Sequence, residues 1–233
     1  MLWIRRIFPT IIIPFAALKF FHMSTVGAYD VMVIAMTLLA ALIMYLSVRK
    51  ITGSDISASL AGIFFLMFTY HLDDAFMRNA VGETFSLCFL PLIVTGIFII
   101  ANTDEKRGWL WILIGCTGVL NSHVLSCILA AVLIILLIIV NIRKLLKWDQ
   151  IRQLIFSAVL IILVNATTLV SLLTFLIGGL NTDNMMVPYT KNLTPILCAF
   201  NLKKWGLPTI GKISILLTIA LIVVKLVLKK KKA

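Results

Sequence analysis

Acidic residues are scarce in this sequence: 233 residues contain nine Asp and Glu against 21 Lys and Arg, a formal net charge of +12. A strongly basic balance is one indication of nucleic-acid binding. Here, however, the basic residues lie in short clusters between long apolar runs, as they do in the cytoplasmic loops of membrane proteins. Because the apolar runs leave no soluble domain, we expect no nucleic-acid partner.

The signatures of soluble enzymes and metal centres are also lacking. The sequence has no Cys-x-x-Cys pair, no His-Glu-x-x-His, no glycine-rich phosphate loop and no Ser-His-Asp spacing. The cysteines lie in or beside apolar runs without the spacing of metal ligands, and we interpret them as buried apolar side chains. They are Cys88, Cys116, Cys127 and Cys198.

Apolar residues are abundant, at 61% of the chain, and the mean hydropathy is +1.10. A soluble domain contains roughly 45–50% apolar residues. Only helices and closed barrels can cross lipid, and continuous runs such as residues 133–140 lack the alternation of barrel strands. We therefore predict an all-α, polytopic transmembrane helical bundle with about eight membrane segments. These are residues 7–22, 29–48, 56–70, 84–101, 109–121, 122–140, 154–177 and 213–228.

Three of these segments contain residues that interrupt a helix. Pro9 and Pro14 make residues 7–22 either a kinked span or a helix at the membrane interface. Pro91 predicts a bend in residues 84–101. Residues 109–140 are too long for one span, and we divide them at Asn121-Ser122-His123.

The distribution of basic residues predicts the orientation. If every segment crosses once and both termini are cytoplasmic, most of the 21 Lys and Arg residues lie on the cytoplasmic side, as the positive-inside rule requires. We therefore expect a multi-pass protein of the cell membrane, with membrane lipid as a partner. This orientation puts the loops 71–83 and 178–212 on the outer face, together with the break at His123.

The most unusual polar stretch runs from Tyr70 to Glu83, between two apolar runs. Ionisable groups near bilayer hydrocarbon are costly and usually functional. Asp73 and Asp74 are adjacent and point about 100° apart on a helix, so we expect separate roles, either as catalytic groups or as a solvated loop. Glu83 begins the next segment, where a carboxylate either stabilises the helix N-terminus or acts in catalysis or metal binding.

Three further side chains are candidates for substrate binding. Arg78 either pairs with the neighbouring acids or binds a phosphate, which the guanidinium geometry suits. His123 either forms a hydrogen bond between helices or contacts a substrate head group. Tyr70 opens the polar stretch and is the third candidate.

Two motifs carry a family resemblance. In the first, Tyr70 leads to Arg78, then to the pair Gly82-Glu83, and then to Pro91-Leu92 inside the next apolar run. In the second, the glycine-containing stretch from Gly115 is followed by Ser122-His123-Val124. Both resemble large bacterial polytopic membrane proteins that are labelled 6-pyruvoyl-tetrahydropterin synthase-related and are similar to the YfhO-like group.

That family is similar in layout to the GT-C membrane glycosyltransferases, which take a sugar from a polyprenyl-phosphate donor on the outer face. The resemblance implies a GT-C-like fold and a role in lipid-linked sugar transfer. Arg78 would steady the lipid phosphate, Glu83 would orient a hydroxyl or hold a divalent metal, and His123 corresponds to the histidine after the family's glycine-rich helix.

The chain departs from that family in two ways. GT-C enzymes usually carry a catalytic aspartate in the first outer loop, whereas no acidic residue precedes Asp30. The family's proteins are also much longer, so we expect a truncated member. Three functions stay open: a glycosyltransferase, active or inactive in this short form; a transporter or lipid-handling protein; and a non-catalytic assembly subunit whose protein partner supplies the missing segments.

Overall fold

The computed structural model describes residues 9–177, with side chains described for residues 13–174. Within this range all regular structure is helical and there is no strand, which confirms the all-α class. The predicted loop 178–212 and the predicted segment 213–228 lie outside the described residues.

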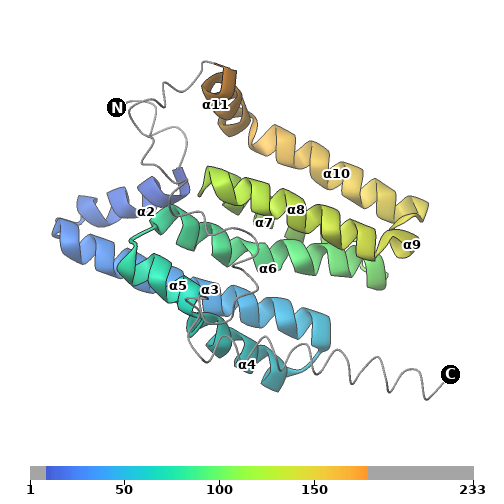
Figure 1. Ribbon diagram of the computed structural model, residues 1–233, viewed down its shortest axis with the longest axis horizontal. Coiled ribbons are helices and arrows are strands. Elements are labelled where there is room, and N and C mark those ends of the chain that lie inside the picture. Colours follow the sequence, from blue (N-terminus) through green and yellow to red (C-terminus); the bar gives the residue numbers. More distant parts are fainter. Residues whose placement is uncertain (1–8, 178–233) are drawn as a thin grey trace, which may run out of the picture. The chain divides into compact units, whose positions relative to one another are not determined.

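Helices of very different lengths follow one another along the described residues (Figure 1). They are α2 (Pro9–Phe20), α3 (Thr25–Thr52), α4 (Asp55–Leu66), α5 (Thr69–Leu72), the π-helix η1 (Asp73–Met77), α6 (Val81–Asn102), α7 (Gly108–Leu120), α8 (Val124–Val140), α9 (Ile142–Leu145), α10 (Trp148–Val164) and α11 (Ala166–Ile177).

Two of the described helices, α3 and α6, are by themselves long and apolar enough to cross a membrane. Two bent pairs qualify when each pair is counted as one span: α4 with α5–η1, bent by 47°, and α10 with α11, bent by 70°. The described part therefore contains two to four candidate spans. The expected number of about eight segments is not confirmed.

The individual segments differ from the predictions in informative ways. Helix α2 has 12 residues, which rise about 18 Å at 1.5 Å per residue, too little to cross about 30 Å of hydrocarbon. The predicted span 154–177 falls on two helices, α10 and α11, which are separated at Asn165 and bent by 70°, so it is not one straight helix. The loop predicted at residues 71–83 is largely helical. The predicted break between α7 and α8 at Asn121–His123 is confirmed.

The hairpin of α3 and α4 is closed by local capping. Ser24 begins α3 by accepting a hydrogen bond from the Gly27 N–H at 3.0 Å. Gly53 ends it with φ +70°, a left-handed conformation that glycine adopts without a steric penalty. Ser54 then caps α4 through the Ser57 N–H. The chain reverses at Gly53-Ser54, and α4 packs back along α3.

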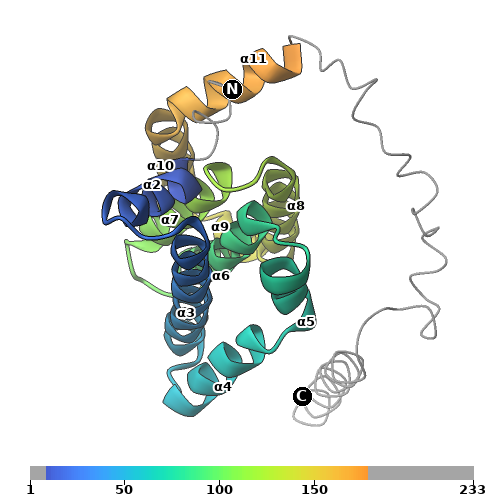
Figure 2. The ribbon, with the colours of Figure 1, turned by 90° about the vertical axis from the view of Figure 1, so that its left-hand side faces the viewer.

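Helix α6 is the centre of the packing and contacts α3, α7 and α8 (Figure 2). It runs as one helix through Pro91, so the bend expected there does not break it. On its α7 side the buried residues include Ile93, Ile97 and Ile112. The predicted burial of cysteine is confirmed for Cys88 and Cys116.

Glycine allows α6 and α7 to approach closely. A Cβ atom added to Gly96 would lie 2.8 Å from the carbonyl oxygen of Gly108, and one added to Gly118 would lie 2.2 Å from the Phe89 ring. Small residues at helix crossings are how membrane helices gain van der Waals contact, since burial against lipid contributes no hydrophobic gain. The α6–α7 pair is thus a rigid frame for the residues at its ends.

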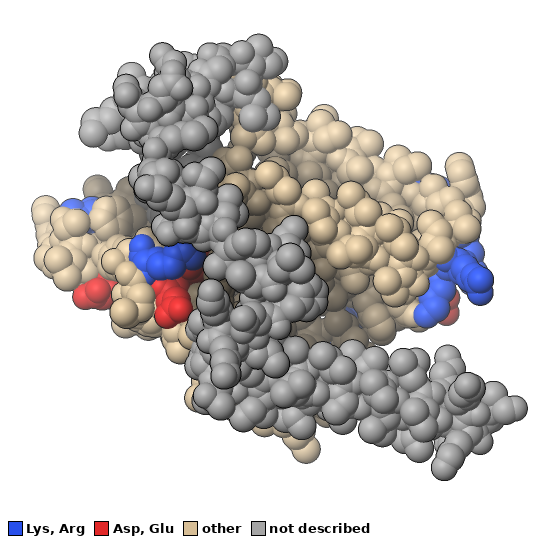
Figure 3. Space-filling view, in the orientation of Figure 1, with Lys and Arg blue, Asp and Glu red and all other residues tan. Residues whose placement is uncertain are grey.

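Charged side chains gather near the two ends of α6, close to α5 at one end and α9 at the other, on the face that Figure 3 shows. At the α9 end, Lys50 pairs with Glu105 at 2.7 Å and Lys144 bonds to Asn102. These contacts bring together the end of α3, the α6–α7 turn and the α8–α10 connection. The opposite end carries the stretch from Tyr70 to Glu83.

Candidate functional site

The chain between α5 and α6 follows a tight path set by backbone hydrogen bonds. In η1 the Arg78 N–H donates to the Asp73 carbonyl at 2.7 Å, and the Ala80 N–H donates to the Asp74 carbonyl at 2.8 Å. Asn79 then takes φ +52°, a left-handed conformation that Asn tolerates better than most residues. The Tyr29 hydroxyl of α3 donates to the Asn79 side chain at 2.9 Å. This bond ties the turn to α3.

The turn assembles four side chains, Tyr70, Asp74, Arg78 and Glu83, which we call the Arg78 cluster. The guanidinium Nη1 lies 2.5 Å from Asp74 Oδ1, and Nη2 lies 3.3 Å from Glu83 Oε2. The Tyr70 hydroxyl donates to the other Glu83 oxygen. Pairing between Arg78 and its neighbouring acids, one of the two alternatives left by the sequence, is the arrangement in the structure.

The members of the Arg78 cluster differ in their access to solvent. The Asp74 side chain is fully buried, that of Glu83 is 19% exposed and that of Arg78 is 54% exposed. Hydrogen bonding to Tyr70 and the charge of Asp74 raise the pKa of the Arg78 guanidinium, which stays cationic. Two carboxyl groups share this one cation, so both terminal nitrogens of Arg78 are already engaged within the cluster.

Asp73 and Asp74 lie in different environments, as their angular separation predicted. Asp73 is exposed and makes no ion pair among the described residues, whereas Asp74 is buried against Arg78. We expected that Glu83 could hold a divalent metal ion. Nowhere in the described part, however, do three His, Cys, Asp or Glu side chains gather to hold a metal ion. Both oxygens of Glu83 are already engaged by Tyr70 and Arg78.

One turn of α5–η1 holds buried polar atoms without a hydrogen-bond partner among the described residues. They are Asp74 Oδ2 and both ring nitrogens of His71, which is 1% exposed and packs on the Phe65 ring. Buried polar atoms nearly always have a partner in the protein or in ordered water. His71 was not among our candidates, although its i, i+3 spacing to Asp74 on a helix was a usable signal.

His123 is joined to the same end of α6 through two serines. Its Nδ1 lies 3.0 Å from Ser126 Oγ, which lies 2.7 Å from Ser86 Oγ, and the Ser86 hydroxyl donates to the Glu83 carbonyl at 2.8 Å. The structure thus brings His123 to the helix turn that carries Glu83. The sequence had predicted that the two would meet at one face.

The direction of these bonds depends on the tautomer of the His123 ring. When Ser86 donates to the Glu83 carbonyl, Ser126 donates to Ser86 and Nδ1–H of His123 donates to Ser126, so that Nε2 is the acceptor of the neutral ring. When Ser86 donates to Ser126, Ser126 donates to Nδ1 and Nε2–H is the donor.

A second polar network, missed in the sequence, lies where α10 meets α11. The Asn165 side-chain amide donates to Thr117 Oγ1 at 2.9 Å, and its oxygen accepts from the Asn121 amide at 2.7 Å. Thr168 donates to the Asn121 oxygen at 2.7 Å. The network borders a cavity of about 650 Å³ between α7 and α11. Because Asn165 lies inside an apolar run, its hydrogen bonding to another helix could not be recognised in the sequence.

Comparison with protein-family models, curated proteins and solved structures finds no match to this chain. The resemblance to the YfhO-like group and to GT-C enzymes stays a prediction from the two sequence motifs. The geometry of the Arg78 cluster and of His123 is therefore the basis for a functional proposal.

Proposed function

We propose that this chain binds a lipid-linked sugar at the Arg78 cluster, on the outer face of the membrane, and serves a GT-C-like sugar transfer. The observation that carries the proposal is the pairing of half-exposed Arg78 with Glu83, whose backbone carbonyl is linked to His123 through Ser86 and Ser126. Apolar helices beside this polar end suit a ligand whose head group is polar and whose tail is lipid.

The charges in the cluster favour the sugar over the phosphate as the group it recognises. Both terminal nitrogens of Arg78 already face carboxyl groups, so a phosphate would have to compete with these acids for the guanidinium. Sugar hydroxyls, by contrast, donate to carboxylates and accept from guanidinium groups. The role in phosphate binding that the resemblance implied for Arg78 is therefore not part of the proposal.

Each group has a role in this proposal. Glu83, held in place by Tyr70, accepts a hydrogen bond from a sugar hydroxyl, and Arg78 donates to a neighbouring one. The Nε2 atom of His123 forms a hydrogen bond with a third. Buried Asp74 does not touch the ligand and holds Arg78 in position.

A binding measurement tests the proposal. The full chain is reconstituted in phosphatidylcholine vesicles, and its affinity for undecaprenyl-phosphate glucose is compared with that for sugar-free undecaprenyl phosphate. We expect the sugar-bearing lipid to bind more tightly. Glu83→Gln removes the charge at nearly constant shape and is expected to weaken binding about tenfold, since a hydrogen bond to a charged group contributes about 1.5 kcal/mol or more.

Asp73→Asn is the matched control, because it removes a neighbouring carboxylate that is exposed and unpaired among the described residues. Equal affinity for the two lipids, or unchanged binding in Glu83→Gln, would contradict the proposal. Release of undecaprenyl phosphate over time, with a hydroxyl-bearing lipid acceptor added to take up the glucosyl group, reports transfer. Binding without release would support the sugar-binding site but contradict the transfer reaction. The chain would then be a non-catalytic subunit.

A further inference from the structure

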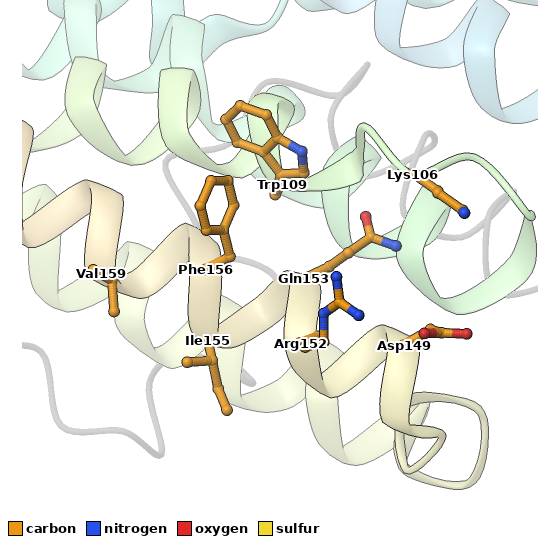
Figure 4. A pocket seen from close by; sticks show the side chains of 8 residues that line it. All are labelled: Lys106, Trp109, Asp149, Arg152, Gln153, Ile155, Phe156 and Val159. Carbon is orange, nitrogen blue, oxygen red and sulfur yellow. The ribbon is translucent and has the colours of Figure 1, made fainter.

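A second cavity, of about 520 Å³, lies between α7 and α10 at the end of α6 that is far from the Arg78 cluster (Figure 4). One part of its lining is polar and comes from the α6–α7 turn and the first turns of α10. The remainder is apolar and continues along α10. We call this cavity the α7–α10 groove, and nothing in the proposed sugar site uses it.

The polar part carries two cations with no internal partner. Lys106 and Arg152 are exposed, and neither makes an ion pair or a hydrogen bond with another described residue. Their neighbours behave differently, since Lys50 pairs with Glu105 and Lys144 bonds to Asn102. The lining thus carries two cations, neither of them in an ion pair, against the one carboxylate of Asp149, and this surplus of positive charge favours an anion.

Two hydrogen-bond acceptors lie beside these cations. The side-chain oxygen of Gln153 is buried and has no hydrogen-bond partner among the described residues. The exposed carboxylate of Asp149 lies in the first turn of α10. Acceptors next to a phosphate site suit a ligand that also carries hydroxyl groups.

The apolar part suits an acyl chain. The Trp109 and Phe156 rings meet edge to face with centroids 4.9 Å apart, and Val159 lies one turn further along α10 (Figure 4). Phe156 and Val159 are each 48% exposed. A free phosphate ion would leave this wall uncovered, whereas a lipid covers both parts.

From this arrangement we infer that the α7–α10 groove binds one phosphatidylglycerol-type phospholipid. Lys106 and Arg152 bind its phosphate, and Asp149 and Gln153 accept hydrogen bonds from the glycerol hydroxyls. One acyl chain lies along Trp109 and Phe156. The charge of the head group thus selects the lipid, and the aromatic wall holds its tail.

Fluorescence quenching tests this inference directly. The full chain is reconstituted in phosphatidylcholine vesicles with increasing fractions of phosphatidylglycerol brominated on its acyl chains. The difference in quenching between the wild type and Trp109→Phe is the quenching of Trp109, and it reports the lipid in the groove. We expect Lys106→Gln and Arg152→Gln each to raise the fraction of lipid at half-quenching about fivefold, the effect of one basic residue on an anionic lipid.

The control is Arg143→Gln, which removes an exposed cation of α9 outside the groove. It is expected to leave half-quenching unchanged. Asp149→Asn should weaken binding of phosphatidylglycerol but not of phosphatidic acid, which lacks the glycerol hydroxyls. Unchanged circular dichroism in each variant shows that the fold is retained.

Three results would overturn the inference. One is equal quenching by brominated phosphatidylcholine, which would mean that the groove does not select charge. Another is an effect of Arg143→Gln as large as that of Arg152→Gln, which would indicate general surface attraction. The third is relief of quenching by inorganic phosphate, which would identify a free-phosphate site.

Discussion

The bent pair α10–α11 and the bent pair formed by α4 and α5–η1 both carry polar side chains, but their chemistry differs. In the first pair these groups lie at the bend, are neutral amides and hydroxyls, and the side-chain amides of Asn121 and Asn165 are both fully hydrogen-bonded. In the second pair they lie on α5–η1 and in the turn that follows it, include charged groups, and buried atoms of His71 and Asp74 lack a partner among the described residues.

We interpret the first network as structural and the second as the candidate functional site. A satisfied neutral network stabilises one arrangement of helices. A charged cluster with partly exposed members is costly near lipid, and proteins usually retain such groups for function. The four predictions below test this distinction, from the largest expected effect to the smallest.

Arg78→Gln should have the largest effect on stability. It leaves the Asp74 carboxylate, which is fully buried, without its counter-charge. We expect the free energy of unfolding to fall by about 1–3 kcal/mol, measured by denaturation in detergent. Adding Asp74→Asn should recover part of the loss, because the uncompensated charge is removed. Additive effects of the two substitutions would show that the pair is not coupled.

Asn165→Leu should have the second largest effect. It removes the amide that links α10 to Thr117 and Asn121 of α7. Hydrogen bonds between membrane helices contribute about 0.6 kcal/mol each, so a loss of about 1 kcal/mol is expected in the same assay. Binding of undecaprenyl-phosphate glucose should persist. Ser171→Ala, which removes an exposed hydroxyl bonded only within α11, is the control.

Ser126→Ala should lower the free energy of unfolding only slightly, by about 0.6 kcal/mol, but it should change the tautomer of the His123 ring. Without Ser126 the hydrogen bond to Nδ1 is lost. Nitrogen NMR of the histidine ring should show one tautomer in the wild type and a mixture of forms in the variant. The same mixture in both proteins would show that Ser126 does not fix the tautomer.

Asp73→Asn should have the smallest effect. The Asp73 side chain is exposed, so its change is expected to alter the free energy of unfolding by less than about 0.5 kcal/mol. Sugar binding should also be unchanged. A loss of binding equal to that of Glu83→Gln would extend the functional site to Asp73 and remove the contrast between the two aspartates.

The break at Asn121–His123 could be predicted because glycine and polar residues interrupt an apolar run too long for one span. The break at Asn165 could not, since a single Asn in an apolar run is compatible with a continuous helix. Its partners Thr117 and Asn121 are more than 40 residues away along the chain. The same holds for η1, whose following turn is tied to Tyr29 of α3, 50 residues before Asn79.

Composition by itself determined that this chain is helical and that its helices include ones apolar enough for a membrane. In lipid, the backbone polar groups of a continuous apolar run can form their hydrogen bonds only within a helix. The distribution of basic residues also predicted that the stretch from Tyr70 to Glu83 and His123 would meet at one face, and the structure links His123 to the Glu83 backbone. Only the tertiary structure decided that Asp74, and not Asp73, is buried against Arg78. The two aspartates are equivalent in sequence, and the choice depends on how the π-helix turns against α6.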